Sequence, residues 1–352
     1  MEKQFIRRQR MQRRKTAKIF LVCWMTVLAV FVKVYYRNEG RPCTKELFAM
    51  DTYMSFTAYG RNGEKAVDAA IREVQRLDAL LSTGDASSEV SRINAAGGGK
   101  MSEDTRALLQ ASLAIGRETG GVFDPTVYPL MKLWGFPTGE YHVPTEAELE
   151  EVLALVDASK IQQNRTNVLL GEGQSVDFGG IAKGYTSSRI MEIFQEYEIT
   201  SGMVSLGGNV QVMGRKTDKS KWQVGIQDPD GRQGEVLAVV EAEDQAVITS
   251  GGYERYFEED GNTYIHIIDP RTGYPAESGL SSVTILSPDG MLADALSTSL
   301  YIMGYDCAAA FWQEQSLPFE MVLVTDQGNI YITEGLEGSF RCEHPYTVLK
   351  AE

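Results

Sequence analysis

Apolar residues recur every three to four positions along several stretches of the chain, which is the spacing of a helix with one buried face. In the stretch 64–81, Ala66, Ala70, Val74 and Leu77 share one side. Similar patterns and their end signals predict further helices at 103–118, 145–155, 181–197, 291–303 and 306–315.

Short runs rich in β-branched and aromatic residues alternate with Gly, Asp and Pro turns, which is typical of β-strands. These runs are 55–59, 204–206, 222–226, 236–241, 246–250, 263–268, 282–286, 321–325 and 330–333. Most of them are consecutive, which favours antiparallel pairing over a doubly wound parallel sheet. The pattern therefore predicts an α+β body with a mixed, largely antiparallel sheet flanked by helices.

The start of the chain has a different pattern, because an unbroken apolar run, Ile19–Val32, follows a segment rich in Arg and Lys. Lys33 can extend its charged end to a membrane surface, and Val34–Tyr36 continues the run to the interface. A cleavable signal peptide would look similar, but no small-x-small site follows the run. We therefore expect one uncleaved N-terminal transmembrane helix.

The chain then divides into four expected segments. They are a basic cytoplasmic tail (1–18), a transmembrane signal-anchor (19–36), a linker (37–45) and a catalytic domain (46–352). Because basic segments stay in the cytoplasm, we expect a single-pass protein of the cell membrane with its catalytic domain on the extracytoplasmic side.

The charge of the chain is unevenly distributed. Its formal net charge is -14, yet residues 1–41 carry 11 basic and 2 acidic side chains. The remaining 311 residues carry 23 basic and 46 acidic side chains. A body this acidic repels phosphate backbones, so we expect no nucleic acid among its partners.

Several common catalytic motifs are missing from the sequence. It contains no GxxxxGK[ST], GxGxxG, HExxH or GxSxG, and only three histidines. None of the four cysteines forms a CxxC pair, which disfavours a cysteine zinc site. Whether Cys307 and Cys342 form a disulfide stays open at this point.

The stretch Val176–Tyr185 (VDFGGIAKGY) has the pattern of a strand end, a glycine turn and a helix start. Paired glycines let a ligand approach the backbone, and the free N–H groups of a helix start suit a phosphate. Lys183 falls in the first turn, where a cation opposes the helix dipole unless an anion is bound. An ordinary strand-to-helix turn explains the stretch about as well as a phosphate site does. The position of Lys183 slightly favours the phosphate site.

The stretch Thr263–Gly273 is a strand that runs into a turn with Pro and Gly in typical positions. A structural hairpin closed by Asp269 explains these residues but leaves His266 and Arg271 unexplained. A lone histidine is more often structural than catalytic, so this stretch alone favours no activity.

Asp294 and Thr298 lie four residues apart and share one face of a predicted helix. Their neighbours are apolar, so an unpaired carboxylate there would be costly and some cation must balance it. A carboxylate and a hydroxyl, together with phosphate oxygens, are ligands that Mg²⁺ prefers. On this helix alone, a salt bridge from Asp294 to a Lys or Arg across the core is the simpler explanation.

The order of the motifs adds information that no single motif provides. From about Phe48 to Gly304 the sequence resembles the ApbE-like family of FAD:protein FMN transferases. The matching motifs are MDTYM, LST with SRIN, FDPTVYPLMKLWGF, VDFGGIAKGY, SLGGN, SGGYERYF, HIIDPRTG and ADALST. The resemblance implies an ApbE-like fold and an enzyme that uses FAD and Mg²⁺. Such an enzyme moves FMN through a phosphodiester bond onto a Ser or Thr hydroxyl of an acceptor protein and releases AMP.

The resemblance also implies roles for individual residues. The metal ligands would be the Asp294 carboxylate, the Thr298 hydroxyl and a backbone carbonyl at Gly180. His266 matches a family histidine thought to assist proton transfer. The positions that line the FAD site in similar proteins are Met50, Phe123, Asp124, Asp177, Lys183 and Ile268.

Two positions depart from the family pattern, because Gly84 replaces an aromatic residue and Asp51 replaces the usual Gly after the first Met. We expect protein flavinylation, the transfer of FMN to an extracytoplasmic redox protein. Alternatives are a Mg²⁺-dependent FAD pyrophosphatase, in which water attacks, and a non-enzymatic extracytoplasmic flavin-binding protein. Mere binding would not need a metal at the pyrophosphate, whereas water and a protein hydroxyl cannot be distinguished by these residues.

Overall fold

A computed structural model describes residues 41–232 and 234–351 of the chain. Its centre is a nine-stranded sheet in which all neighbours pair antiparallel except the last two, which run parallel. In spatial order the strands are β1 (Pro42–Ala49), β2 (Thr52–Tyr59), β6 (Ser201–Leu206), β7 (Asn209–Gly214), β10 (Ala246–Gly251), β13 (Leu280–Ser287), β14 (Glu320–Thr325), β15 (Ile330–Thr333) and β17 (Tyr346–Leu349). The predicted α+β body with a largely antiparallel sheet is confirmed.

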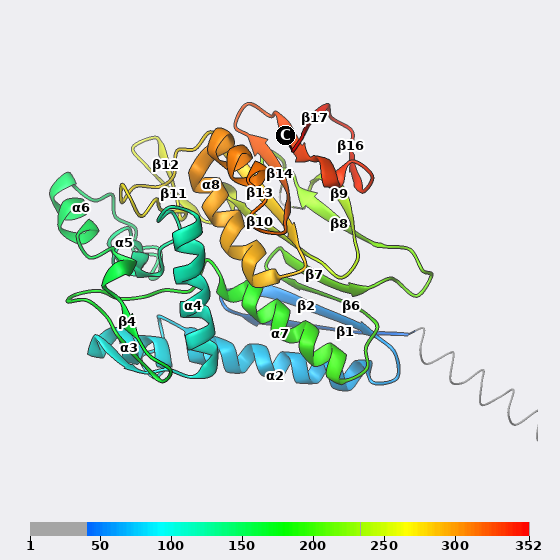
Figure 1. The fold of residues 1–352 in the computed structure, drawn as a ribbon, viewed down its shortest axis with the longest axis horizontal. Coiled ribbons are helices and arrows are strands. Elements are labelled where there is room, and N and C mark those ends of the chain that lie inside the picture. The colour runs from blue at the N-terminus through cyan, green and yellow to red at the C-terminus, as the bar shows by residue number, and fades with distance from the viewer. Residues whose placement is uncertain (1–40, 233, 352) are drawn as a thin grey trace, which may run out of the picture.

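Three long helices cover one face of this sheet (Figure 1). They are α2 (Gly63–Leu81), α7 (Ala182–Glu196) and α8 (Gly290–Gln313). Helices α2 and α7 pack on β2 and β6 through a core that includes Phe56, Phe194 and Val204. Helix α8 packs on β10 and β13 through Ile248 and Leu296, among others.

A smaller sheet lies against the opposite face of the large one. Its strands, in spatial order, are β16 (Phe340–Cys342), β9 (Val236–Ala242) and β8 (Trp222–Gln227). Trp222 and Val240 from this sheet share a buried cluster with Val212, Leu286 and Val322 of the large sheet. The large sheet is therefore covered on both faces, which explains why its central strands are almost entirely buried.

The remaining elements gather at one side of the large sheet, at the left of Figure 1. They are α3 (Glu89–Ala96), β3 (Gly98–Lys100), α4 (Glu103–Glu118), α5 (Tyr128–Leu133), α6 (Glu146–Leu153), β4 (Gln162–Gln163), β5 (Asn167–Leu169), β11 (Tyr256–Glu259) and β12 (Asn262–Ile265). An aromatic core of Trp134, Phe136 and Phe257 joins α5 to the β11–β12 hairpin. The Trp134 indole N–H donates to the Gly273 carbonyl at 2.8 Å, which ties down the turn that follows His266.

Most predicted elements appear, and the differences have physical reasons. Every predicted strand run overlaps a strand, and the two predicted C-terminal helices are the halves of α8, which is broken at Gly304. Gly304 has φ 77° and ψ 173°, a backbone conformation that side chains other than hydrogen rarely allow. Helix α3 was not predicted because it buries only Val90 and Ile93, too few positions for a clear period.

The first strand begins earlier than expected. The catalytic body was predicted to start at residue 46, but β1 begins at Pro42 and pairs with β2 along its whole length. Cys43 and Leu47 pack against the core under α2, so residues 42–45 of the expected linker belong to the sheet. The predicted tail (1–18) and anchor (19–36) lie outside the described residues. Within 41–232 and 234–351, no helix has both the length and the apolar character to cross a membrane.

The β1–β2 turn shows how this chain accommodates its departure from the family glycine. Met50 and Asp51 both have left-handed backbones, with φ of 48° and 58°. Asp is among the residues that best tolerate this conformation after Gly, so Asp51 can close the same tight turn. The Thr186 hydroxyl lies 3.9 Å from Met50 Sδ, which places the turn against α7.

The cysteines that could have formed a disulfide are free thiols. Cys307 is exposed on α8 and Cys342 is half-buried on β16. The Cys342 thiol instead lies 3.3 Å from the Leu237 carbonyl oxygen. The fold therefore depends on packing rather than on a covalent link between these two positions.

The close crossing of α7 and α8 makes Gly184 a test of the packing. An added Cβ there would lie 2.1 Å from the Gly290 carbonyl oxygen and 2.6 Å from Asp294 Cβ. A Gly to Ala change in a helix normally stabilises it, but here it must separate two helices. We expect Gly184→Ala to lower the free energy of unfolding in urea by about 2 kcal/mol. Gly338→Ala, whose added Cβ meets no atom within 4 Å, is the control, and equal stability of the two variants would contradict the prediction.

Candidate active site

The Asp294 carboxylate is the most buried charged group of the site, with 3% exposure. Its Oδ2 accepts a hydrogen bond from the Gly184 N–H of α7, and its Oδ1 accepts one from the Asn209 side-chain amide, both at 2.8 Å. Among the described residues no Lys, Arg or His lies within ion-pair distance of it. The core salt bridge that the sequence left open is therefore not formed.

Thr298 follows Asp294 by one helical turn and meets residues from two other segments. Its hydroxyl lies 3.3 Å from that of Ser250, at the end of β10. A Cβ added to Gly180 would lie 3.8 Å from Thr298 Oγ1 and 3.2 Å from the Phe123 ring. The structure thus brings the glycine turn and Thr298 together, and Asp294 is bonded to the helix that this turn begins.

Lys183 lies in the first turn of α7 and has no ion-pair partner within 4 Å among the described residues. Its charge nevertheless acts on Asp177, just before the glycine turn. Burial raises the pKa of Asp177, while the Gly179 N–H at 2.7 Å and the charges of Arg255 and Lys183 oppose the shift. Lys183 and Arg255 are therefore two cations near the glycine turn, and no close ion pair among the described residues neutralises them.

Glu254 stands in the short 3-10 helix Gly252–Glu254 that follows β10. The side chain keeps contact with solvent, yet the protein around it desolvates the carboxylate. This burial raises the pKa of Glu254 to about 7; Lys183 works against the shift and Asp294 adds to it. Two carboxylates that repel each other beside one free ammonium form a region in which a further cation would be favoured.

His266 has a defined tautomer. Its backbone N–H donates to the Arg255 carbonyl at 3.0 Å, and its Nδ1 lies 3.1 Å from the same oxygen. Because a carbonyl can only accept, Nδ1 carries the ring proton and Nε2 has a free lone pair. Burial first, and then the charge of Arg255, lower the pKa of His266 to about 4. The ring is therefore neutral at pH 7 and able to accept a proton at Nε2.

Three other predicted residues have structural partners beside this group. The Asp124 carboxylate accepts hydrogen bonds from the Thr126 N–H and hydroxyl and from the Ala158 N–H, at 2.6 to 3.0 Å. Ile268 is buried in the aromatic core with Trp134. Phe123 is buried against Gly180, where its ring forms one wall of the glycine turn.

The sequence motifs do not by themselves assign Asn209, Glu254 or Arg255 to the site. They occur in the SLGGN and SGGYERYF motifs, which simple turns explain equally well. Their positions follow from the sheet order, because β7, which packs against α7, and β10, which packs against α8, are neighbours in the sheet. The Arg255 guanidinium is also fixed, since its Nη2 donates to the Phe136 carbonyl at 2.6 Å.

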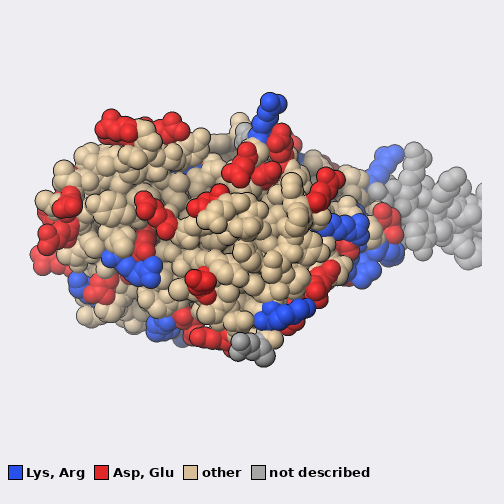
Figure 2. Space-filling model, turned by 90° about the horizontal axis from the view of Figure 1, so that it is seen from above, with Lys and Arg blue, Asp and Glu red and all other residues tan. Residues whose placement is uncertain are grey.

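The surface of the protein is acidic, so binding of an anionic ligand would require positive charge close to the site. Figure 2 shows acidic side chains spread over the face seen from above, with fewer basic side chains placed among them toward both ends. A ligand that carries a pyrophosphate would be repelled by such a surface at long range. Lys183, Arg255 and the helix start supply the opposite sign at short range.

Comparisons with known proteins agree with the fold and show the family. A sequence model described as the ApbE family matches residues 50–323. A FAD:protein FMN transferase of Treponema pallidum is 32% identical over 302 residues, which are 79% of this chain and 83% of the relative. A FAD:protein FMN transferase of Vibrio cholerae is 34% identical over 264 residues, which are 73% and 79% of the two chains.

Solved structures show the same relationship. The ApbE protein of Thermotoga maritima superposes with a TM-score of 0.81 and 33% identity, over 86% of this chain and 100% of that one. The flavin transferase ApbE of Vibrio cholerae gives a TM-score of 0.75 and 28% identity, over 85% of this chain and all of that one. The chain belongs to the ApbE family, and the resemblance seen in its motifs is confirmed.

The raised pKa of Glu254 predicts how stability depends on pH in the absence of a divalent cation. Between the ordinary value of 4.5 and about 7 the folded state binds more protons than the unfolded chain. The free energy of unfolding should therefore fall as pH rises through this window. Thermal unfolding from pH 4.5 to 8 in EDTA would show this fall, and Glu254→Gln should remove it. A curve for Glu254→Gln parallel to that of the parent would contradict the assignment.

Proposed function

We propose that this protein transfers the FMN part of FAD to a Ser or Thr hydroxyl of an acceptor protein, with Mg²⁺ as cofactor and AMP as the released product. The relatives carry the name FAD:protein FMN transferase. The observation that carries the proposal in this chain is the buried Asp294 carboxylate, which lies one helical turn from Thr298 and has no ion-pair partner among the described residues. Both Asp294 and Lys183 act on the nearby Glu254.

The donor set fits Mg²⁺. Asp294 has two carboxylate oxygens, each of which has so far one N–H partner and can accept another bond. Thr298 offers a hydroxyl and Gly180 a backbone carbonyl, so the set consists of oxygen atoms, which this ion prefers. When bound, Mg²⁺ supplies charge neutralisation at the pyrophosphate.

The protein's own residues bind and orient the dinucleotide. The positive end of the α7 dipole and the Lys183 ammonium suit the phosphates, because both present positive charge to an anion. The N–H groups of Ala182 and Gly184 already donate to the Phe178 carbonyl and to Asp294. Arg255 adds a second cation, whose charge also acts on Asp177. Met50, Phe123, Asp177 and Ile268 are the other residues proposed to line or support the FAD site, and Asp124 would do so by fixing its loop.

His266 is proposed to accept the proton of the incoming hydroxyl at Nε2. The acceptor oxygen then attacks the FMN phosphorus, one P–O bond forms, and the P–O bond to the AMP phosphate breaks. AMP leaves with the electrons of the broken bond. Because the ring is neutral above a pKa of about 4, it is ready to accept this proton at physiological pH.

The pattern of basic and apolar residues at the start of the chain supports a proposal about where the protein is located. We propose that the apolar segment 19–36 anchors the protein in the cell membrane, that 1–18 stays in the cytoplasm, and that the catalytic domain acts outside it on a redox protein. Basic flanking residues on one side of an apolar run support this orientation.

The decisive experiment incubates the full chain in detergent with FAD and Mg²⁺, with and without a candidate acceptor protein. We expect a mass gain equal to FMN on the acceptor, together with AMP. AMP and free FMN without an adduct would instead indicate a pyrophosphatase. Intact bound FAD would indicate a binding protein.

Two substitutions test the assigned roles separately. Asp294→Ala should abolish Mg²⁺ binding in calorimetry as well as FAD turnover, because the remaining ligands carry no charge. His266→Ala should lower kcat about a hundredfold or more while leaving Mg²⁺ binding unchanged. His344→Ala, in the loop between β16 and β17, is the control and should behave like the parent. Normal turnover in Asp294→Ala would refute the metal site, and an unchanged kcat in His266→Ala would refute the proton acceptor.

A further inference from the structure

The first turn of α7 has little support of its own. Its N-cap residue, Ile181, provides no side-chain hydrogen bond, and no acidic residue lies in the first turn. Lys183 instead places a positive charge near the positive end of the helix dipole, and Gly184 lowers helix propensity. Contacts from outside the helix must therefore keep this turn in place.

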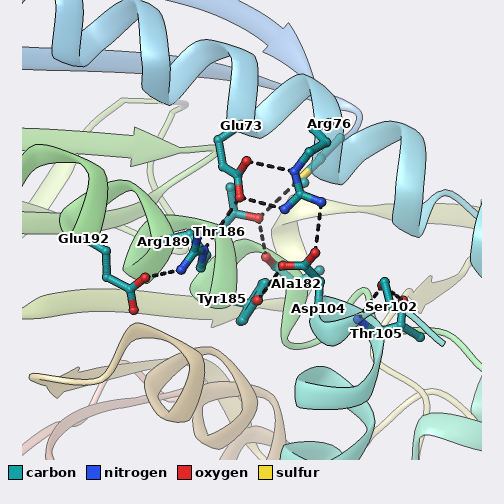
Figure 3. Close-up of polar contacts among 11 residues, drawn as sticks. Glu73, Arg76, Ser102, Asp104, Thr105, Ala182, Tyr185, Thr186, Arg189 and Glu192 are labelled. Carbon is teal, nitrogen blue, oxygen red and sulfur yellow. Dashed lines mark hydrogen bonds and ion pairs between the residues drawn. The ribbon is translucent and has the colours of Figure 1, made fainter. Parts of the chain in front are cut away.

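One such contact begins two residues after Lys183. The Tyr185 hydroxyl donates to Asp104 Oδ1 at 2.7 Å, as Figure 3 shows. Asp104 stands in the first turn of α4, and its Oδ2 accepts a hydrogen bond from Arg76 Nη1 of α2 at 2.9 Å. Arg76 also forms a bidentate pair with Glu73, at 2.7 and 2.8 Å.

The chain of contacts returns to the helix from which it started. Glu73 Oε1 lies 3.6 Å from Arg189 Nε, and Arg189 follows Tyr185 by one turn of α7. The side chains of Glu73 and Asp104 are only 14% and 15% exposed. Their partners Arg76 and Arg189 are 45% and 36% exposed, so each pair is partly solvated, but several linked pairs restrain the helices more than one surface pair would. We call this closed set of contacts the circuit; its residues are Tyr185, Asp104, Arg76, Glu73 and Arg189. The circuit links α7 to both α2 and α4.

The charge states that the circuit needs are kept at neutral pH. Burial acts to raise the pKa of Asp104, but the hydrogen bonds from Arg76 and Tyr185 and the positive charge of Arg76 outweigh it, so the pKa falls below its usual value. Burial and Asp104 raise the pKa of Tyr185, which therefore remains a donor. At neutral pH Asp104 is therefore charged and Tyr185 keeps its proton, as these hydrogen bonds require.

We propose that Tyr185 is a positioning residue that, through Asp104 and Arg76, holds the first turn of α7 so that Lys183 faces the phosphates of FAD. The identity of the ligand rests on the proposed function. The mechanical part of the proposal is that the Tyr185 hydroxyl restrains the first turn of α7. This part depends only on the hydrogen bonds of Tyr185 and Asp104.

Hydrogen exchange without FAD tests the mechanical part. Tyr185→Phe in the full chain removes the hydroxyl and keeps the ring, so the fold should persist. We expect the amides of residues 182–185 to exchange about tenfold faster. Asp68→Asn, which breaks the 2.6 Å Lys45–Asp68 pair elsewhere on α2, should leave these amides unchanged. Unchanged exchange in Tyr185→Phe would overturn the proposal.

A double-mutant cycle tests whether Tyr185 acts through Lys183. Flavin fluorescence should show that Tyr185→Phe weakens FAD binding about tenfold. In a Lys183→Ala background the same change should have little further effect, because the group being positioned is absent. Additive losses would contradict the positioning role. Failure of the parent chain to bind FAD would refute the proposed function, while the exchange experiment would still decide the role of Tyr185 in fixing the turn.

Discussion

The hydrogen bond from the Gly184 N–H to the Asp294 carboxylate is the contact on which the rest of the site depends. It requires α7 and α8 to cross so closely that a side chain on either Gly184 or Gly290 would collide with the other helix. The close approach places a buried carboxylate beside the first turn of α7, where the helix dipole and Lys183 are positive. A buried carboxylate and a positively charged helix start thus become neighbours, which is the arrangement that the proposed metal-assisted reaction would need.

The electrostatics of the site follow from this crossing. Lys183 acts on Asp177, Glu254 and His266, and no close ion pair neutralises it among the described residues. Glu254 is partly protonated near neutral pH because it lies in a desolvated region beside Asp294. His266 is neutral for the related reason that burial and Arg255 oppose its charge. Burial is the largest cause of each shift, and the neighbouring charges modify it.

Parts of the fold far from the crossing fix the remaining groups. The aromatic core around Trp134 holds the β11–β12 hairpin and the following turn, and these carry Arg255 and His266. The circuit from Tyr185 through Asp104 and Arg76 holds the other side, at the start of α7. The two supports have different chemistry, one apolar and one ionic, yet both restrain short segments that have few stabilising contacts of their own.

The sequence by itself determined the helices, the strand runs and the antiparallel class, because periodicity and turn chemistry are local. Its motif order also indicated the family and pointed to Gly180, Lys183, His266, Asp294 and Thr298. Only the tertiary structure decided that Asp294 is hydrogen-bonded to Gly184 and Asn209 rather than paired with a cation. It also decided that Glu254 and Arg255 join the site and that β1 starts at Pro42. These facts depend on strand order and helix crossing, which bring together residues up to 110 positions apart, and no local pattern records such separations.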